Sequence, residues 1–222
     1  MLNWFKKKKY PGFWNNYIEH FKSKNPNDIQ NTRFVVFDTE TTGLDIKNDR
    51  ILSIGCVSVL GNTIDVATNF EVYVSQDVFN KETVEIHGIL KEGNLSKIKE
   101  KEAVVNFLDY VKDAVLVAHH AAFDVAMINQ ALLRLELPKL KNKYIDTGIL
   151  FKKTNFDKNE DKHYGLDELC DLFNIKKHDR HTASGDAFIT SILFLKIKEN
   201  LIKSKNFTLN DLLFYRKKNG LL

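Results

Sequence analysis

The chain has 222 residues, of which 43% are hydrophobic and 28% are charged. This composition is that of a globular protein with one domain of ordinary to large size; it excludes a disordered or fibrous chain, and no stretch reaches the length of a membrane span, so we expect a cytoplasmic protein. The formal charge of +4 is too small to identify a polyanionic partner by itself.

The segment before the first predicted strand combines basic and aromatic side chains. Lysines occupy positions 6–9, and the aromatic residues around them are Trp4, Phe5, Tyr10, Phe13 and Trp14. Two interpretations stay open: the segment touches nucleic acid or another acidic surface, or its aromatic side chains pack onto the domain. A polar break at 25–28 follows. We therefore predict a basic and aromatic helical arm over residues 1–30.

Three strands are predicted next. Residues 34–37 are an apolar run of strand-forming residues that ends at Asp38. Residues 51–60 predict a second strand and residues 63–74 a third, and the pair Gly61-Asn62 between them is typical of a hairpin. An antiparallel arrangement is the simplest one for these strands.

Helical spacing and short apolar runs then alternate along the chain. Helices are predicted at 81–90, 98–112, 122–135, 166–173 and 182–200, and strands at 114–118 and 143–147. Strands separated by helices add to a sheet in parallel. We predict an α/β fold over residues 31–203, with a mixed sheet of three antiparallel and then two parallel strands. A helical extension at 204–222 has Thr208 as its N-cap and runs into basic residues at 216–218.

Two acids stand at the end of the first predicted strand. Alternate residues of a strand share a face, so Asp38 and Glu40 point to the same side as Phe34 and Val36. A lone carboxylate in this position commonly opens a turn, and Asp38 alone would be ordinary. The pair indicates an acidic site.

Two further acids fall on the apolar stripes of predicted helices. Helical spacing places Asp124 with Met127, Ile128, Ala131 and Leu135, and it places Asp186 with Ile189, Leu193 and Ile197. An acid near a helix start is also favoured by the helix dipole, so Asp124 alone has an equally good structural explanation. Taken together, four carboxylates are expected to face one interior.

Carboxylates directed at one interior repel one another unless cations lie between them. Arg180 is the one basic residue in the immediate segments, so we expect metal ions to neutralise the acids. Oxygen ligands favour Mg²⁺ or Mn²⁺, and two such ions about 4 Å apart can stabilise both oxygens in phosphodiester cleavage. His181, five residues before Asp186, is the candidate general base because histidine exchanges protons near neutral pH.

Three segments together resemble the DnaQ-like exonucleases of the DEDDh type, which include proofreading epsilon subunits of bacterial replicative polymerases. They read FDTETTGL at 37–44, VAHHAAFD at 117–124 and HTASGD at 181–186. The resemblance spans roughly residues 33–200 and implies a ribonuclease-H-like fold. It implies that two Mg²⁺ or Mn²⁺ ions are held by Asp38, Glu40, Asp124 and Asp186, with His181 as the general base.

The same resemblance implies a set of substrate contacts. These residues are Thr39, Thr41, Leu44, His87, His120 and Phe123. His120 stands where many relatives have asparagine, which departs from the family pattern at a sugar-side contact. Asp146, at the end of a predicted strand, is expected to be structural.

The resemblance predicts a 3′-to-5′ exonuclease that releases nucleoside 5′-monophosphates from single-stranded or frayed DNA ends. A DNA polymerase or a repair protein would be its partner. RNA is the alternative substrate for the same chemistry. Two other classes stay open: the doublet His178-Asp179 suggests an all-helical HD-type phosphohydrolase, and a nucleic-acid-binding module without activity would keep the fold alone.

Overall fold

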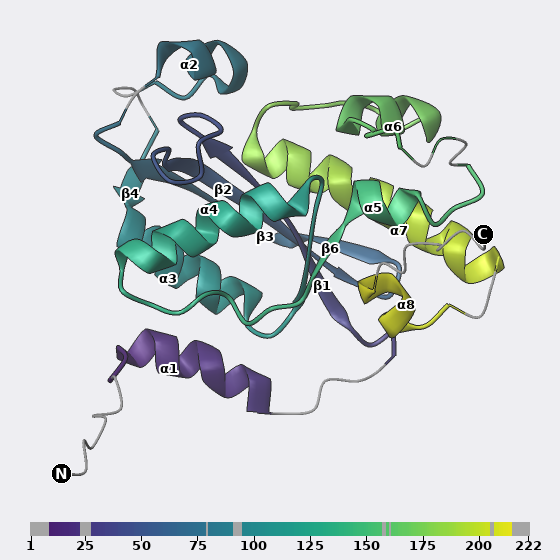
Figure 1. Ribbon diagram of the computed structural model, residues 1–222, viewed down its shortest axis with the longest axis horizontal. Helices are drawn as coiled ribbons and strands as arrows, with labels where there is room; N and C mark the ends of the chain where they lie inside the picture. The colour runs from purple at the N-terminus through teal and green to yellow at the C-terminus, as the bar shows by residue number, and fades with distance from the viewer. Residues whose placement is uncertain are drawn as a thin grey trace.

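The computed structural model describes residues 9–22, 28–78, 80–90, 95–156, 159, 161–204 and 207–214. These residues form a six-stranded sheet in the order β4-β3-β2-β1-β5-β6, with helices on both of its faces (Figure 1). The predicted α/β fold with a mixed sheet is confirmed. Such a sheet also excludes the all-helical HD-type hydrolase.

The antiparallel part of the sheet consists of β1 (Arg33–Thr41), β2 (Ile51–Leu60) and β3 (Thr63–Ser75). Branched apolar residues dominate β1 and β2, and such residues favour a pleated, buried strand. Gly61 makes the tight connection from β2 to β3 with a φ of 56°, a backbone conformation that glycine adopts without strain. The three strands lie where the sequence predicts them, except that β1 continues past Asp38 to Thr41.

The parallel part holds one strand more than predicted. β5 (Val115–Ala118) pairs with β1, and β6 (Tyr144–Asp146) pairs with β5. The additional strand, β4 (Lys97–Lys99), pairs with the end of β3. The prediction of a helix from residue 98 was wrong at its start, because α3 begins at Glu100. A strand this short carries no periodic signal, and only pairing with its neighbour makes it extended.

One face of the sheet is covered by α1, α3 and α4, and the other by α5 to α8 (Figure 1). On the first face these helices are α1 (Gly12–Glu19), α3 (Glu100–Val111) and α4 (Ala121–Arg134). On the second they are α5 (Thr147–Phe151), α6 (Leu166–Leu172), α7 (Ala183–Ser204) and α8 (Leu209–Leu213). A hydrophobic core lies on each face of the sheet, and alternate residues of β1 pack into these two cores. Val35 and Phe37 pack into one core, and Phe34 and Val36 pack into the other.

Two shorter elements complete the fold. α2 (Lys81–His87) lies apart from the two layers, at the top of Figure 1. A 3-10 turn, η1 (His20–Lys22), follows α1. No helix in the described ranges is long and apolar enough to cross a bilayer.

The aromatic residues of α1 belong to the core. Trp14 and Tyr17 are buried, and Tyr10 and Phe13 pack against the same cluster. The interpretation that the N-terminal aromatic side chains pack onto the domain therefore holds for these residues. The lysines at 6–8, Trp4, Phe5 and the basic residues at 216–218 lie outside the described residues.

Tyr17 ties α1 to the segment before β6 and, through Asn142, to the segment before β5. Its hydroxyl donates a hydrogen bond of 2.7 Å to Asn142 Oδ1 and accepts one of 2.8 Å from the amide of Lys141. The Asn142 side chain in turn donates to the carbonyl oxygens of Lys112 and Ala114. The polar groups of these buried and partly buried contacts are thus paired with one another, which fixes α1 on the domain.

Candidate active site

The end of β1 carries two acids on the face that α7 covers. Asp38 lies opposite Gly55 in the antiparallel ladder with β2, and Glu40 lies opposite Ser53. The parallel ladder with β5 stops at Val36, so the acidic end of β1 extends beyond β5. The predicted common face of Asp38 and Glu40 is confirmed by the alternation of the two cores along β1.

Asp124 reaches the exposed edge of β1 from the first turn of α4. Its Oδ1 atom accepts hydrogen bonds from the amide of Thr39 at 3.0 Å and from the Thr39 hydroxyl at 2.7 Å. The carboxylate thus replaces the missing strand partner where the β5 ladder has ended. Thr39, predicted as a substrate contact, is buried in this pairing and positions the acid.

Asp186 comes from the first turn of α7, and a glycine lets that turn approach the sheet. A Cβ atom at Gly55 would overlap the backbone of Ala183 and Ser184. Because Gly55 is the ladder partner of Asp38, this contact brings the start of α7 beside the acids of β1. The sequence offered one signal for it, since an isolated glycine within a strand often marks a close backbone approach.

Three of the acids converge closely. Asp38, Glu40 and Asp186 each present a carboxylate oxygen, and these oxygens lie within 4.8 Å of one another. Asp124 is near enough to act on the same charges, since it is the strongest of the neighbouring acids that raise the pKa of Asp38. The structure therefore gathers all four acids that the sequence singled out.

Burial and mutual repulsion oppose the charged form of these acids. Burial raises the pKa of Asp38 well above its usual range, and the charges of Asp124, Asp186 and Glu40 add to the effect. Burial, followed by the charges of Asp186 and Asp124, raises the pKa of Glu40 to about 7. Burial also raises the pKa of Asp124 to about 7, although the Thr39 hydrogen bonds lower it. Such a cluster of oxygen donors fits hard divalent cations, which would relieve the repulsion.

Arg180, the one basic residue that the sequence places in the acidic segments, also reaches this cluster. Its Nη1 atom donates to Asp186 Oδ1, and its Nε atom donates to Asp167 Oδ1 at 2.8 Å. The sequence places Arg180 near the acids but does not predict the direction of its side chain, because Arg180 lies in an irregular turn that has neither a helical nor a strand period.

The backbone of His181 contacts the Asp186 side chain. Its amide donates to Asp186 Oδ2 at 3.3 Å, while its side chain is exposed to solvent. Its φ of 62° falls in the left-handed region, as does that of Asp179. A Cβ atom at Gly185 would overlap the carbonyl oxygen of Asp179, so that glycine lets this turn fold back onto the start of α7.

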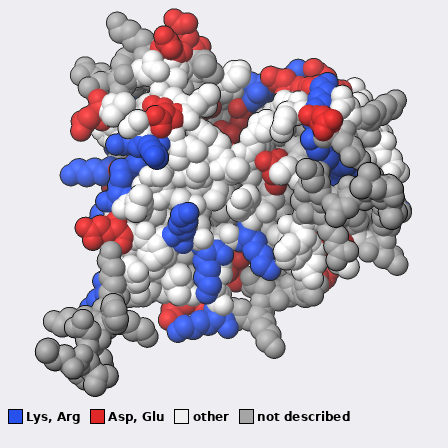
Figure 2. All heavy atoms as spheres, viewed as in Figure 1, with Lys and Arg blue, Asp and Glu red and all other residues white. Residues whose placement is uncertain are grey.

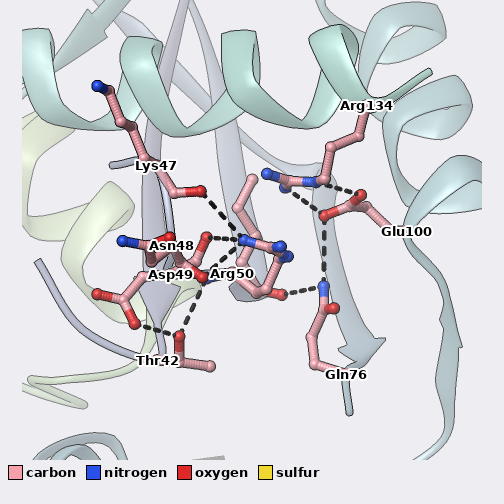
Figure 3. Close-up of polar contacts among 9 residues, drawn as sticks. Thr42, Lys47, Asn48, Asp49, Arg50, Gln76, Glu100 and Arg134 are labelled. Carbon is pink, nitrogen blue, oxygen red and sulfur yellow. Dashed lines mark hydrogen bonds and ion pairs between the residues drawn. The ribbon is translucent and has the colours of Figure 1, made fainter. Parts of the chain in front are cut away.

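The turn that follows the β1 acids is held by its own polar groups (Figure 3). The Thr42 hydroxyl donates to Asp49 at 2.7 Å, and Arg50 Nη1 donates to the carbonyl oxygens of Asn48 and Asp49. Thr41 is buried, and its hydroxyl donates to the carbonyl oxygen of Gly43. Leu44 is 84% exposed at this turn, so an apolar side chain is presented to solvent on a braced loop.

The remaining predicted substrate residues differ in their surroundings. His87 is buried at the end of α2; its Nδ1 atom accepts from the amide of Ile89, and its Nε2 atom has no hydrogen-bond partner among the described residues. Phe123 is partly buried against the α4 core. His120 is exposed with a φ of 61°, in the left-handed region where both histidine and asparagine are enriched.

Asp146 has the structural role expected of it. Its Oδ1 atom accepts from the amides of Gly148 and Ile149 at the start of α5, and its Oδ2 atom accepts from the amide of Ala121 at the start of α4. One carboxylate thereby caps two helix starts. His119, which the sequence did not single out, lies between Thr147 and the carbonyl oxygen of Tyr164, and burial lowers its pKa to about 4.

Acidic atoms lie at the bottom of a hollow in the molecular surface. Figure 2 shows this hollow between the surface over α2 and the surface over α6. Asp38 and Glu40 are only partly buried, so the site is open to solvent on one side, while β1 holds it on the other.

Comparison with known proteins yields consistent matches. The model of the RNase T exonuclease family matches residues 35–194. The chain is 36% identical over 173 residues to a PolC-type DNA polymerase III of Caldanaerobacter subterraneus, covering 76% of the chain and 12% of that protein. It is 34% identical over 176 residues to the DNA polymerase III epsilon subunit of Salmonella typhimurium, covering 74% of the chain and 70% of that protein. The structure of exonuclease X with 5′-overhanging duplex DNA superposes with a TM-score of 0.62 at 21% identity, covering 81% of the chain and 97% of that protein.

Proposed function

The chain belongs to the RNase T exonuclease family, and from this membership we propose that it is a divalent-metal-dependent 3′-to-5′ exonuclease. The carboxylate oxygens of Asp38, Glu40 and Asp186 within 4.8 Å of one another are the observation that carries the proposal. Bound Mg²⁺ or Mn²⁺ ions would supply stabilisation for the negative charge on the attacking and leaving oxygens of a phosphodiester.

The protein's side chains supply the metal ligands and the general base. Asp38 and Glu40 provide ligands from β1, Asp186 provides one from α7, and Asp124, oriented by Thr39, provides one from α4. His181 is the proposed general base: its exposed imidazole stands on the turn whose amide binds Asp186, so it can take a proton from the attacking water on the solvent side. Cleavage would release nucleoside 5′-monophosphates.

We propose contacts with the terminal nucleotides for Thr39, Thr41, Leu44, His87, His120 and Phe123. The exposed Leu44 on its braced turn supports a stacking or wedging contact with a base. Thr39 and Thr41 are buried, so they would act through the backbone that they hold.

DNA is the substrate that we favour over RNA, as single strands or frayed 3′ ends. Support comes from the relatives, which are named as DNA polymerase III components. The chain spans 12% of the PolC-type polymerase that it matches. Because this relative is a DNA polymerase, we also propose that the chain associates with a DNA polymerase in the cytoplasm.

The test is digestion of matched DNA and RNA oligonucleotides labelled at the 3′ or the 5′ end. With Mg²⁺ we expect the 5′-labelled DNA strand to shorten stepwise and the 3′ label to leave first as a mononucleotide. Chelation by EDTA should stop the reaction. Digestion from the 5′ end, or full activity in EDTA, would refute the proposal, and faster digestion of RNA would refute the DNA preference.

A further inference from the structure

Arg180 bridges two helices through two carboxylates. Its Nε and Nη2 atoms donate to Asp167 Oδ1 and Oδ2 at 2.8 and 3.3 Å, and its Nη1 atom donates to Asp186 Oδ1. Asp167 lies on α6 and Asp186 on α7. The Arg180 side chain is 17% exposed, so the contact with Asp186 is largely shielded from water.

The guanidinium acts as a counter-charge to Asp38 and Glu40 as well as to Asp186, which it contacts. Its charge lowers the pKa of both Asp38 and Glu40, against the effects of burial and of the neighbouring acids. Although burial opposes its own charge, hydrogen bonds and charges from Asp167 and Asp186 raise the pKa of Arg180. Arg180 therefore remains cationic at neutral pH.

Arg180 and a divalent cation compete for the same ligand. Asp186 is one of the three acids whose oxygens converge, and its Oδ1 atom is already engaged by the guanidinium. Two divalent ions would neutralise four carboxylates by themselves, so a guanidinium in contact with a filled site would be an excess positive charge. Asp167 offers Arg180 a bidentate contact that lies outside the cluster.

We propose that Arg180 is an exchangeable counter-ion: it holds Asp186 in the metal-free protein and yields it to the divalent cation, while Asp167 retains the guanidinium. This inference rests on the proposed function, because it takes the same four acids as the metal ligands. Its consequence is that Arg180 stabilises the metal-free protein and weakens metal binding.

The experiment is a calorimetric titration with MnCl₂, together with melting temperatures in EDTA and at saturating MnCl₂. Relative to wild type, Arg180→Gln should bind Mn²⁺ roughly tenfold more tightly, because a positive charge no longer opposes the ion. Its melting temperature should fall in EDTA, and the difference from wild type should shrink at saturating Mn²⁺. Neither readout depends on nuclease activity.

Arg134→Gln is the matched control. Arg134 also forms a two-point contact with a carboxylate, Glu100, at 2.9 and 2.5 Å, and its side chain is 24% exposed (Figure 3). That pair belongs to a separate network with Gln76. We expect this variant to lose some stability equally in EDTA and in Mn²⁺, with unchanged Mn²⁺ affinity.

Arg180→Lys is a second variant at this position, and it provides the same test if Arg180→Gln does not fold. A lysine retains the charge but cannot contact both carboxylates with the same geometry, so its Mn²⁺ affinity should lie between those of wild type and Arg180→Gln. Mn²⁺ affinity that is equal to or below wild type in the Arg180 variants would overturn the exchange while leaving the proposed function intact. Failure of the wild type itself to bind Mn²⁺ would overturn both.

Discussion

The carboxyl group of Asp38 lies where, under the proposed function, it would bind a metal ion, and its charge disfavours the metal-free fold. It is surrounded by three other acids, and burial and their charges raise its pKa well above the usual range. Natural sites of this kind retain local strain because function requires it.

Asp38→Asn should therefore raise the stability of the metal-free protein and lower its exonuclease activity. Without metal we expect the free energy of unfolding to rise by roughly 1–2 kcal/mol, because one repelling charge is gone. Exonuclease activity should fall by about a thousandfold or more, because a metal ligand is lost. Urea unfolding in EDTA and digestion of a labelled oligonucleotide measure the two effects. Asp109→Asn, which changes an exposed acid on α3, should alter neither.

His181 needs a replacement that tolerates its backbone. Because its φ is 62°, asparagine is a better choice than alanine for removing the imidazole without disturbing the turn. His181→Asn should lower the rate of digestion by roughly 10²–10⁴-fold and leave Mn²⁺ affinity close to that of wild type. A rate within a factor of two of wild type would remove His181 from the role of general base.

The four acids were predictable from the sequence because each lies on a regular element. Alternation along β1 placed Asp38 and Glu40 together, and the helical stripe placed Asp124 and Asp186 inward. Arg180 was not predictable in this way, because the direction of a side chain in an irregular turn depends on tertiary contacts. The same holds for the pairing of Thr39 with Asp124, which joins residues 85 positions apart.

At the level of elements, the contact between α7 and β2 decides whether the site assembles. Gly55 has no side chain, and the backbone of α7 at Ala183 and Ser184 occupies the space where a Cβ would lie. Because both neighbours are backbone, a small side-chain movement cannot relieve an overlap there.

Gly55→Ala should thus displace the start of α7 and with it Asp186. We expect a loss of roughly 2–4 kcal/mol in the free energy of unfolding and a weaker affinity for Mn²⁺ in the fraction that folds. Denaturant unfolding and calorimetry give the two values. Gly12→Ala, at the start of α1 where a Cβ meets nothing within 4 Å, should be neutral or slightly stabilising.

The contact of α1 with the domain is expected to contribute to stability. Tyr17→Phe removes a hydroxyl that bonds both Asn142 and the amide of Lys141. We expect a loss of about 1–3 kcal/mol in the free energy of unfolding, because the buried Asn142 side chain and the partly buried Lys141 amide both lose a partner. Nuclease activity measured below the melting temperature should be unchanged. A loss of activity without a loss of stability would instead give α1 a role in substrate binding.

Element boundaries were predictable where the chain has a clear period. β2 begins and ends as predicted, while β4 was missed because only its pairing with β3 makes those residues extended. The packing of α1 also depended on tertiary structure: its aromatic residues fit either a nucleic-acid contact or a core, and the sequence alone did not distinguish them.

For the whole molecule, the acidic cluster predicts that stability without metal depends on pH. The pKa of Glu40 is raised from 4.5 to about 7, and that of Asp124 from 3.8 to about 7. At a pH between the unfolded pKa values and about 7, these two acids bind more protons in the folded chain than in the unfolded chain, so the free energy of unfolding falls as pH rises. Their contribution to stability is fully present below the unfolded pKa values and is lost as pH rises through the folded values of about 7.

Urea unfolding in EDTA should show a decrease of roughly 1–4 kcal/mol between about pH 5 and about pH 8. Saturating Mn²⁺ should abolish the decrease, because the ion binds the deprotonated acids. Glu40→Gln should reduce the slope in EDTA, since one of the titrating groups is removed. A stability that rises over this interval in EDTA would contradict the raised pKa values.

The double hydrogen bond from Thr39 to Asp124 bears on how an uncleaved complex should be prepared. An alanine at position 124 would leave the Thr39 amide and hydroxyl without their acceptor and loosen the end of β1, so a captured oligonucleotide would rest on an altered strand. Asparagine at position 38 disturbs no such support, and it is therefore the better dead variant for crystallising a trapped substrate.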